Sequence, residues 1–383
     1  MSNRKEAIAQ HRAWAGKIST EPKMSVGTRE DLAIAYTPGV AEPCKDIAAD
    51  PEAAYAYTIK GNTIAVVSDG SAVLGLGNIG PAAALPVMEG KTILFKKFGG
   101  VNAFPICLDA QDTDEIVTAV KQLAPTFGGI NLEDISAPRC FEIERRLKDE
   151  LDIPVFHDDQ HGTAIVVLCG VINALRITGK RVEECRIVVN GSGAAGIAIA
   201  KLLLLYGFKH LIICDSKGVV SSKSERLNDV KREMLACTNE DDISGTLADA
   251  LVGADIFVGV SAPGAVTADM VASMNEDAIL FALANPVPEI YPDEAKAAGA
   301  RIVGTGRSDF PNQINNVIAF PGIFKGALEG RAKAITEDMK LAAARALANL
   351  VSDEELCEDF IMPEPFDPRA AEVVSQAVKD CLS

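Results

Sequence analysis

The segment from Ile187 to Asp215 constrains this chain most, because it reads as a strand, a glycine-rich turn, a helix and a second strand. A β-branched run is followed at once by a G-x-G-x-x-G motif at residues 191–196. Gly191 permits the tight turn, Gly193 lets a pyrophosphate approach the backbone, and Gly196 lets the helix pack on the strand. This order of elements predicts a nucleotide-binding β-α-β unit.

The helix after the motif completes the predicted dinucleotide site. Its first residues, Ala194 and Ala195, would present free N–H groups and a partial positive charge to the phosphates. Asp215 ends the second strand about twenty residues after the glycines, where a carboxylate binds the ribose hydroxyls. Its charge would repel a 2′-phosphate, although Lys217 could offset it. We therefore predict NAD or NADP as the cofactor, with a slight preference for NAD.

A second G-x-G-x-x-G, at residues 75–80, has a different context. It does not follow directly on a strand, and Pro81 interrupts the helix that should begin there. We interpret it as a tight glycine turn lining a cleft.

Strands and helices alternate along most of the chain, which predicts an α/β fold. In the first half, strands are expected at Thr63–Val67, Thr92–Phe95, Ala103–Leu108, Gly129–Leu132 and Pro154–Phe156, and helices at Glu115–Leu123 and Cys140–Leu151. In the second half, strands are expected at Ile187–Asn190, Leu211–Cys214, Ile256–Val260, Ala278–Ala282 and Arg301–Val303, and a long helix with Thr336 as a start cap at Ala332–Val351.

A chain of 383 residues exceeds one ordinary core, so we expect two domains, each with a mostly parallel sheet. The boundary falls within 155–185, inside a predicted helix. We divide the chain into an N-terminal domain, 1–158, with the substrate, metal and catalytic residues, and a Rossmann-like dinucleotide-binding domain with C-terminal helices, 159–383. The first thirty residues are expected to form a charged helical lead-in.

The net charge of −16 disfavours nucleic acid and anionic membrane surfaces as partners. The apolar stretches at Ile165–Leu175 and Ile197–Leu205 are too short to span a bilayer. The nine cysteines are scattered without a C-x-x-C pair, which is typical of reduced thiols. We expect a cytoplasmic protein that binds a small molecule.

Acidic pairs follow two predicted strands of the first half. Glu133-Asp134 follows one strand and Asp158-Asp159 follows the next. The carboxyl ends of parallel strands border the ligand crevice, so these carboxylates should meet there. Like charges that close repel one another unless a cation intervenes, and all-oxygen ligation suits Mg²⁺ or Mn²⁺. His161 is interpreted as structural, because His157 precedes the helix start and the two need not share a face.

The chain resembles the malic enzymes, in the compact prokaryotic form, over nearly its whole length. The shared motifs are Tyr36-Thr37-Pro38-Gly39-Val40-Ala41, Ser68-Asp69-Gly70, Leu74-Gly75-Leu76-Gly77-Asn78, Glu89-Gly90-Lys91, Asn131-Leu132-Glu133-Asp134, Asp158-Asp159-Gln160-His161-Gly162-Thr163-Ala164, Gly191 to Gly196, Asn285-Pro286 and Asn315-Asn316-Val317. Without this resemblance, pattern alone assigns no role to the tyrosine, the lysine or the asparagines.

The resemblance implies oxidative decarboxylation of malate to pyruvate and CO₂ with reduction of NAD(P)⁺, and accessory oxaloacetate decarboxylation. It makes Lys91 the general base, which needs a lowered pKa, and Tyr36 the acid that protonates the enolate carbon. The metal ligands match Glu133, Asp134 and Asp159, with Asp158 beside them. Asn285 matches a cofactor contact, and the substrate contacts match Lys91, Asn315 and Asn316.

One position departs from the family. Larger members have a substrate-binding arginine where this chain has Ala72. The anionic grip on the substrate must therefore come from elsewhere in this chain. Two other functions stay open: a malolactic-type enzyme that releases lactate, and a non-catalytic dinucleotide sensor. The family usually forms homodimers or homotetramers.

Overall fold

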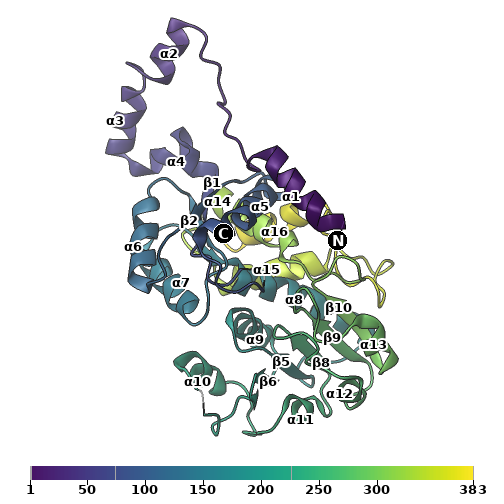
Figure 1. Ribbon diagram of the computed structural model, residues 1–383. Coiled ribbons are helices and arrows are strands. Elements are labelled where there is room, and N and C mark those ends of the chain that lie inside the picture. Colours follow the sequence, from purple (N-terminus) through teal and green to yellow (C-terminus); the bar gives the residue numbers. More distant parts are fainter. Residues whose placement is uncertain (1, 74, 226, 383) are drawn as a thin grey trace.

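Two β-sheets organise the computed structural model, which describes residues 2–73, 75–225 and 227–382 (Figure 1). The first sheet has the parallel order β2-β1-β3-β4, and the second the order β10-β9-β8-β5-β6-β7, in which β7 runs antiparallel to β6. The first contains β1 (Thr63–Ser68), β2 (Asn102–Cys107), β3 (Gly129–Leu132) and β4 (Val155–His157). The second contains β5 (Arg186–Asn190), β6 (His210–Asp215), β7 (Gly218–Val219), β8 (Ile256–Gly259), β9 (Ala278–Ala282) and β10 (Ala300–Thr305). The predicted α/β fold with two mostly parallel sheets is confirmed.

Helices cover both faces of the first sheet: α5 (Pro81–Gly99), α6 (Thr113–Leu123) and α7 (Arg139–Glu150). The strand expected at Thr92–Phe95 is wrong, because these residues lie inside α5. A short apolar run can occur in a helix or in a strand, and it is too short to show the period of either one. Pro81 begins α5 rather than interrupting it, since proline is well suited to the first helical turn.

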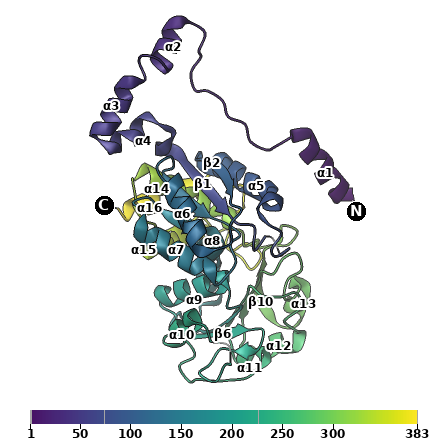
Figure 2. The same cartoon turned by 60° about the vertical axis from the view of Figure 1, so that its left-hand side comes forward.

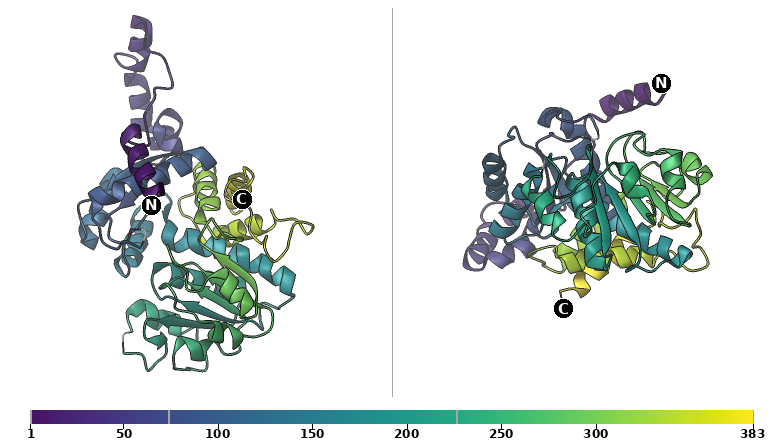
Figure 3. Two further views of the ribbon diagram at one scale, coloured as in Figure 1. Left: turned by 45° about the vertical axis from the view of Figure 1, so that its right-hand side comes forward. Right: turned by 90° about the horizontal axis from the view of Figure 1, so that it is seen from below.

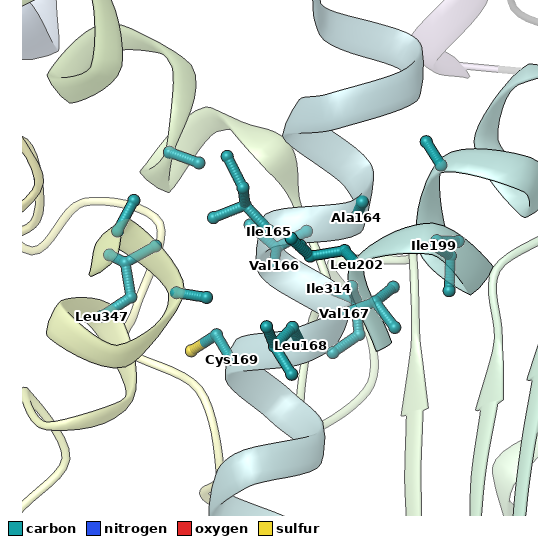
Figure 4. Packing of buried hydrophobic residues seen from close by; sticks show 14 of the residues in the cluster. Ala164, Ile165, Val166, Val167, Leu168, Cys169, Ile199, Leu202, Ile314 and Leu347 are labelled. Atoms are coloured by element: carbon teal, nitrogen blue, oxygen red, sulfur yellow. The ribbon is translucent and has the colours of Figure 1, made fainter. Parts of the chain in front are cut away.

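The helix α8 (Asp158–Thr178) lies between the two sheets and forms the centre of the main core (Figure 3, left). Its apolar side chains from Ala164 to Cys169 pack among residues such as Leu202 and Leu347 (Figure 4). It packs against α9 and α15. With 21 residues it is longer than the apolar stretch recognised in the sequence, and it is long and apolar enough to cross a membrane. However, 67% of its most apolar window is buried inside the structure, as in the core helix of a globular protein.

The second sheet is flanked by helices in a Rossmann-like arrangement: α9 (Ala194–Tyr206), α10 (Asp229–Leu235), α11 (Leu247–Leu251), α12 (Ala268–Ala272) and α13 (Pro292–Ala297). One face packs on the main core and the other on a separate apolar cluster that includes Phe257 and Leu280.

The C-terminal helices return to the first sheet. They are η3 (Asn316–Ile318), α14 (Phe320–Glu329), α15 (Glu337–Ala348) and α16 (Ala370–Asp380). The Phe95 ring of α5 lies 4.6 Å from that of Phe320 and 5.4 Å from that of Phe324. Thr336 caps α15 as predicted, because its side chain accepts a hydrogen bond from the Met339 N–H. The division at 158/159 stays a prediction.

The N-terminal helices lie on the outside of the molecule. They are α1 (Ser2–Trp14), α2 (Arg29–Ala35), α3 (Ala41–Ala49), η1 (Pro51–Ala53), α4 (Ala54–Tyr57) and η2 (Ile59–Asn62). Residues 18–57, which we call the arm, include α2, α3 and α4, and these helices contain no buried residue. In Figures 1 and 2, α2 and α3 project away from the body. The predicted helical lead-in therefore ends at Trp14 and does not continue as one helix.

Candidate active site

Neighbouring strands bring the acidic pairs together. Because β3 pairs with β4 in parallel, with Leu132 opposite His157, the residues that follow the two strands meet at one edge of the sheet. Glu133, Asp134 and Asp159 each offer a carboxylate oxygen, and these oxygens lie within 4.8 Å of one another. The convergence expected from the sequence is present.

The geometry of this carboxylate cluster fits a divalent cation. Asp134 has a positive φ of 54°, and its N–H donates to Asp159 Oδ2 at 2.8 Å. Among the described residues, the buried Asp134 Oδ2 has no hydrogen-bond partner. Burial and the charge of Asp159 raise the pKa of Asp134 to about 9. A carboxylate with a free buried oxygen among like charges is a site that a hard cation such as Mg²⁺ or Mn²⁺ would stabilise.

Lys91 comes from α5 and lies directly beside the cluster. Its Nζ is 2.9 Å from Glu133 Oε1 and 2.5 Å from Asp158 Oδ2, and 4.2 Å from the centre of the Phe320 ring. Burial lowers the pKa of the Lys91 ammonium, but the attraction of Asp158 and Glu133 outweighs burial and holds the pKa above its ordinary value. The pKa of Lys91 is therefore not lowered as a general base requires, because the neighbouring carboxylates stabilise the charged form.

Asp158 faces the lysine side of the site. It is fully buried, and its Oδ2 also accepts a hydrogen bond from Asn316 Nδ2 at 2.6 Å. This bond joins the start of α8 to η3. Asn316 is thus placed beside Lys91, where the sequence resemblance puts a substrate contact.

The two histidines have different environments. His157 ends β4 and is fully buried, whereas His161 Nε2 lies 2.7 Å from Glu144 Oε1 and its Nδ1 lies 3.0 Å from Lys340 Nζ. Burial, opposed by the nearby Glu144, lowers the pKa of His161 to about 4. Both ring nitrogens of His161 therefore contact protein groups, and its structural role stays a prediction.

A cleft of about 720 Å³ opens in front of these residues. This volume is typical of sites for small ligands. The predicted site residues that line it are Lys91, Glu133, Asp134, Asp159, Asn285, Asn315 and Asn316. His11 and Lys17, which sequence reasoning did not select, also line it. A lone surface lysine gives no signal that it will border a cleft.

The glycine-rich turn after β5 has the backbone its motif requires. Gly191 has a φ of +131°, and a Cβ there would lie 2.7 Å from Val260 O. A Cβ on Gly196 would lie 1.7 Å from Gly191 O, whereas a Cβ on Gly193 would meet nothing within 4 Å. Gly193 is the N-cap of α9, so Ala194 and Ala195 occupy the first turn. The open space over Gly193 is where a pyrophosphate can approach.

The second glycine motif forms a tight turn, closed by a bridge between Val73 and Gly77. The interpretation as a turn is confirmed. Its glycines are absent from the described lining of the cleft, although a Cβ on Gly75 would lie 3.1 Å from the backbone oxygen of Asn285. The turn therefore lies behind Asn285, which lines the cleft, and the expectation that the turn itself lines the cleft is wrong.

Asp215 is held by a lysine that the sequence did not indicate. Lys231 Nζ of α10 lies 2.5 Å from Asp215 Oδ2, and both side chains are largely buried. Lys217, the expected partner, contributes only its backbone N–H, at 2.7 Å from Asp215 Oδ1. The charge of Asp215 is thus neutralised by an ion pair.

Asn131 belongs to a family motif, but the sequence assigned it no role of its own. It lies within β3, is fully buried, and donates from Nδ2 to Glu133 Oε2 at 2.8 Å. A polar residue inside an otherwise apolar strand was the available signal, because a buried amide needs a partner.

Tyr36 is the one predicted catalytic residue outside the cleft. It follows α2 on the arm and is 68% exposed. It is not among the described residues that line the cleft of its own chain.

These features define a class of protein: an oxidoreductase with a Rossmann-like dinucleotide-binding sheet. Residues 15–148 match the family model of the malic enzyme N-terminal domain, and residues 160–379 match that of the malic enzyme NAD-binding domain. The chain belongs to the malic enzyme family.

Named relatives agree with the family models. The chain is 58% identical over 379 residues to a bifunctional malic/malolactic enzyme of Bacillus subtilis, covering 99% of this chain and 92% of the relative. It is 51% identical over 381 residues to an NADP-dependent malic enzyme of Haemophilus influenzae, covering 95% of this chain and 50% of the relative. Among solved structures, the NAD-dependent malic enzyme of Thermotoga maritima matches with a TM-score of 0.94 and 51% identity, over 97% of this chain and 98% of that one.

Proposed function

We propose that this chain converts (S)-malate to pyruvate and CO₂ while it reduces NAD(P)⁺, and that it needs Mg²⁺ or Mn²⁺. The observation that carries the proposal is the single cleft that Lys91, the carboxylate cluster and Asn285 share. Each part supplies one requirement of the reaction: a proton acceptor, a site for the cation that holds an anionic substrate, and a border with the dinucleotide site.

Glu133, Asp134 and Asp159 would hold the cation, which when bound supplies Lewis-acid stabilisation of the substrate oxygens. Lys91 takes the proton of the C2 hydroxyl as the hydride leaves for the nicotinamide. Lys91 would become a base when Glu133 holds the cation, because less negative charge would then stabilise the protonated lysine. Asn315 and Asn316 contact the substrate. Tyr36 returns a proton to the enolate carbon after CO₂ departs.

The cofactor of the proposed reaction is a freely exchanging dinucleotide bound by Gly191, Gly193, Gly196 and the first turn of α9. The Asp215–Lys231 pair has no net charge, which favours acceptance of both NAD and NADP. We keep a slight preference for NAD, because the Asp215 carboxylate would repel a 2′-phosphate.

The test is an assay with malate, Mn²⁺ and each cofactor in turn, following the reduced nicotinamide and pyruvate together. Equal amounts of both products support the proposal. Absence of both products with either cofactor refutes it, and dinucleotide binding without turnover would favour the sensor. Addition of oxaloacetate to the same enzyme tests the accessory decarboxylation.

A malolactic reaction is the second candidate, because the Bacillus subtilis relative is named for both activities. This reaction uses the same cleft, keeps the cofactor bound and releases lactate. Analysis of the carboxylic acid product separates the candidates: pyruvate with a stoichiometric reduced cofactor supports the first, and lactate without net reduction supports the second.

A further inference from the structure

Lys17 lines the cleft although it belongs to neither sheet. It follows α1, where Gly16 has a φ of +110° that turns the chain, a conformation that glycine adopts without strain. The Lys17 N–H donates to Glu89 Oε2 at 3.2 Å, and its Nζ donates to the backbone oxygen of Pro86 at 2.5 Å. The backbone and the end of this side chain are therefore both held against α5, the helix that carries Lys91.

The face of α5 under Lys17 is the face that borders the cleft. Pro86, Gly90 and Leu94 recur at every fourth residue of the helix, and all three line the cleft. A Cβ on Gly90 would lie 3.8 Å from Lys17 Nζ. The Lys17 ammonium thus lies over this face, beside the residue that precedes Lys91.

The charge of Lys17 is not neutralised by a carboxylate. Among the described residues, Lys17 Nζ forms no ion pair, and its acceptor at Pro86 is an uncharged carbonyl oxygen. An ammonium group has three N–H donors, so donors remain for a further acceptor. The side chain is only partly exposed, and its free donors border the cleft.

The proposed substrate needs a cation of this kind. Malate is a dianion, and the cleft that would receive it contains the carboxylate cluster. Lys91 is already paired with two carboxylates, so its charge is shared. Ala72 lies close to the cluster, since its N–H donates to the backbone oxygen of Asp134 at 2.9 Å, but alanine brings no charge. Lys17 is therefore the cation of the described cleft lining that is free to bind an anion.

We infer that Lys17 binds the malate carboxylate that remains in pyruvate, the carboxylate of C1. The inference rests on the proposed function, which makes malate the substrate. A cation held on the C4 carboxylate would oppose the loss of CO₂, because the negative charge of that group moves toward C3 and C2 as the C3–C4 bond breaks. The C1 carboxylate keeps its charge throughout the reaction, so a cation there binds substrate and transition state equally well. Such uniform binding lowers the KM and leaves kcat unchanged.

Lys17→Met tests the inference, because it removes the ammonium and keeps the backbone N–H that donates to Glu89. We expect the KM for malate to rise about tenfold to a hundredfold, the range for one hydrogen bond between charged groups. The kcat should stay within about twofold of wild type, and the KM for the dinucleotide should not change. Lys17→Arg, which keeps the charge, should recover most of the affinity. Lys5→Met removes the same charge from an exposed position of α1, and this control should keep the wild-type KM.

Product inhibition by pyruvate shows which carboxylate Lys17 holds. Pyruvate retains the C1 carboxylate and lacks C4, so its inhibition constant should rise in Lys17→Met by a factor similar to that of the malate KM. Unchanged pyruvate inhibition overturns the inference. An unchanged KM for malate, or a change confined to the KM for the dinucleotide, also overturns it. A lower kcat and melting temperature with an unchanged malate KM would give Lys17 a structural role only, which is equally a failure.

A binding measurement separates this inference from the proposed function. If the wild-type protein does not oxidise malate, the proposed function fails. Calorimetric titration of wild type and Lys17→Met with malate, in the presence of Mn²⁺, then reads the inference without turnover. Weaker binding to Lys17→Met than to wild type and Lys5→Met supports it, and equal binding to all three proteins overturns it.

Discussion

At the residue scale, the side chains nearest the proposed reaction form a buried group of one lysine and several carboxylates. Lys91 forms ion pairs with Glu133 and Asp158, and among the described residues the buried Asp134 Oδ2 has no hydrogen-bond partner. The residue types and their order along the chain predicted this gathering, because parallel strands align their carboxyl ends. The sequence could not predict the raised pKa of Lys91, since that depends on distances of a few ångströms across two elements.

Two glycines of the dinucleotide turn are expected to respond differently to the same substitution. Gly196→Ala places a Cβ 1.7 Å from Gly191 O, so it should lower both the thermal stability and the affinity for the dinucleotide. Gly193→Ala meets no protein atom, so it should keep the melting temperature and lose affinity only. Thermal unfolding and cofactor titration of both variants check this. Equal losses of stability in the two variants would contradict it.

Lys231 is expected to set the balance between the two cofactors. Lys231→Met leaves the Asp215 carboxylate unpaired, so a 2′-phosphate should be repelled while a ribose hydroxyl is still accepted. We expect the ratio of kcat/KM for NADP to that for NAD to fall by about tenfold, the effect of one charged hydrogen bond. Arg232→Met, a neighbouring exposed cation, is the control and should leave the ratio unchanged. An unchanged ratio in Lys231→Met would mean that the charge of Asp215 does not decide the choice between the two cofactors.

At the element scale, the second sheet was easier to predict than the first. Its five parallel strands were each expected from short β-branched or apolar runs, and all are present. The error at Thr92–Phe95 arose because a run of four residues is too short to distinguish the period of a helix from that of a strand. The ion pair of Asp215 with Lys231 joins β6 to α10, and no local pattern in the sequence indicates such a contact.

Asp255 lies directly before β8 and joins this end of the strand to the start of β5. It accepts hydrogen bonds from Lys180 Nζ at 2.7 Å and from the Arg186 N–H at 2.9 Å. Burial raises the pKa of Asp255, but these bonds outweigh burial and hold the pKa below its ordinary value. Asp255 therefore stabilises the fold above the pKa of the unfolded chain, and this stabilisation is lost as the pH falls through the lower folded pKa.

Asp255→Asn should consequently lower the free energy of unfolding by about 1–3 kcal/mol near neutral pH. The difference from wild type should shrink as the pH falls, because the wild-type carboxyl is then also uncharged. Denaturant unfolding at several pH values measures it, with the exposed Asp241→Asn as control. A difference that stays constant with pH would show that the Asp255 charge is not responsible.

At the scale of the whole molecule, the cleft lies where the two sheets meet, with α8 between them. Family motifs indicated the members of this site, but no sequence pattern indicated that Tyr36 would lie on an exposed arm. Hydrophobic periodicity predicts helices and strands, but it does not predict which segment projects from the body of the molecule.

Cation binding should stabilise the whole molecule through the carboxylate cluster. A ligand that binds only the folded state at about a hundred times its Kd adds about 2.7 kcal/mol of stability. We expect Mn²⁺ to raise the melting temperature of wild type and of Asp109→Asn, an exposed control, and to have little effect on Asp159→Asn. A chelator should reverse the increase. Equal increases in all three proteins would place the cation elsewhere.

The most direct test of the proposed reaction follows the hydrogen on C2 of malate. Malate deuterated at C2 is incubated with the wild-type protein, Mn²⁺ and NAD⁺, and the products are examined by mass spectrometry. Oxidative decarboxylation predicts one deuterium in each reduced nicotinamide released, together with an equal amount of unlabelled pyruvate. Deuterated lactate with no labelled cofactor in solution, or unchanged malate, would contradict it.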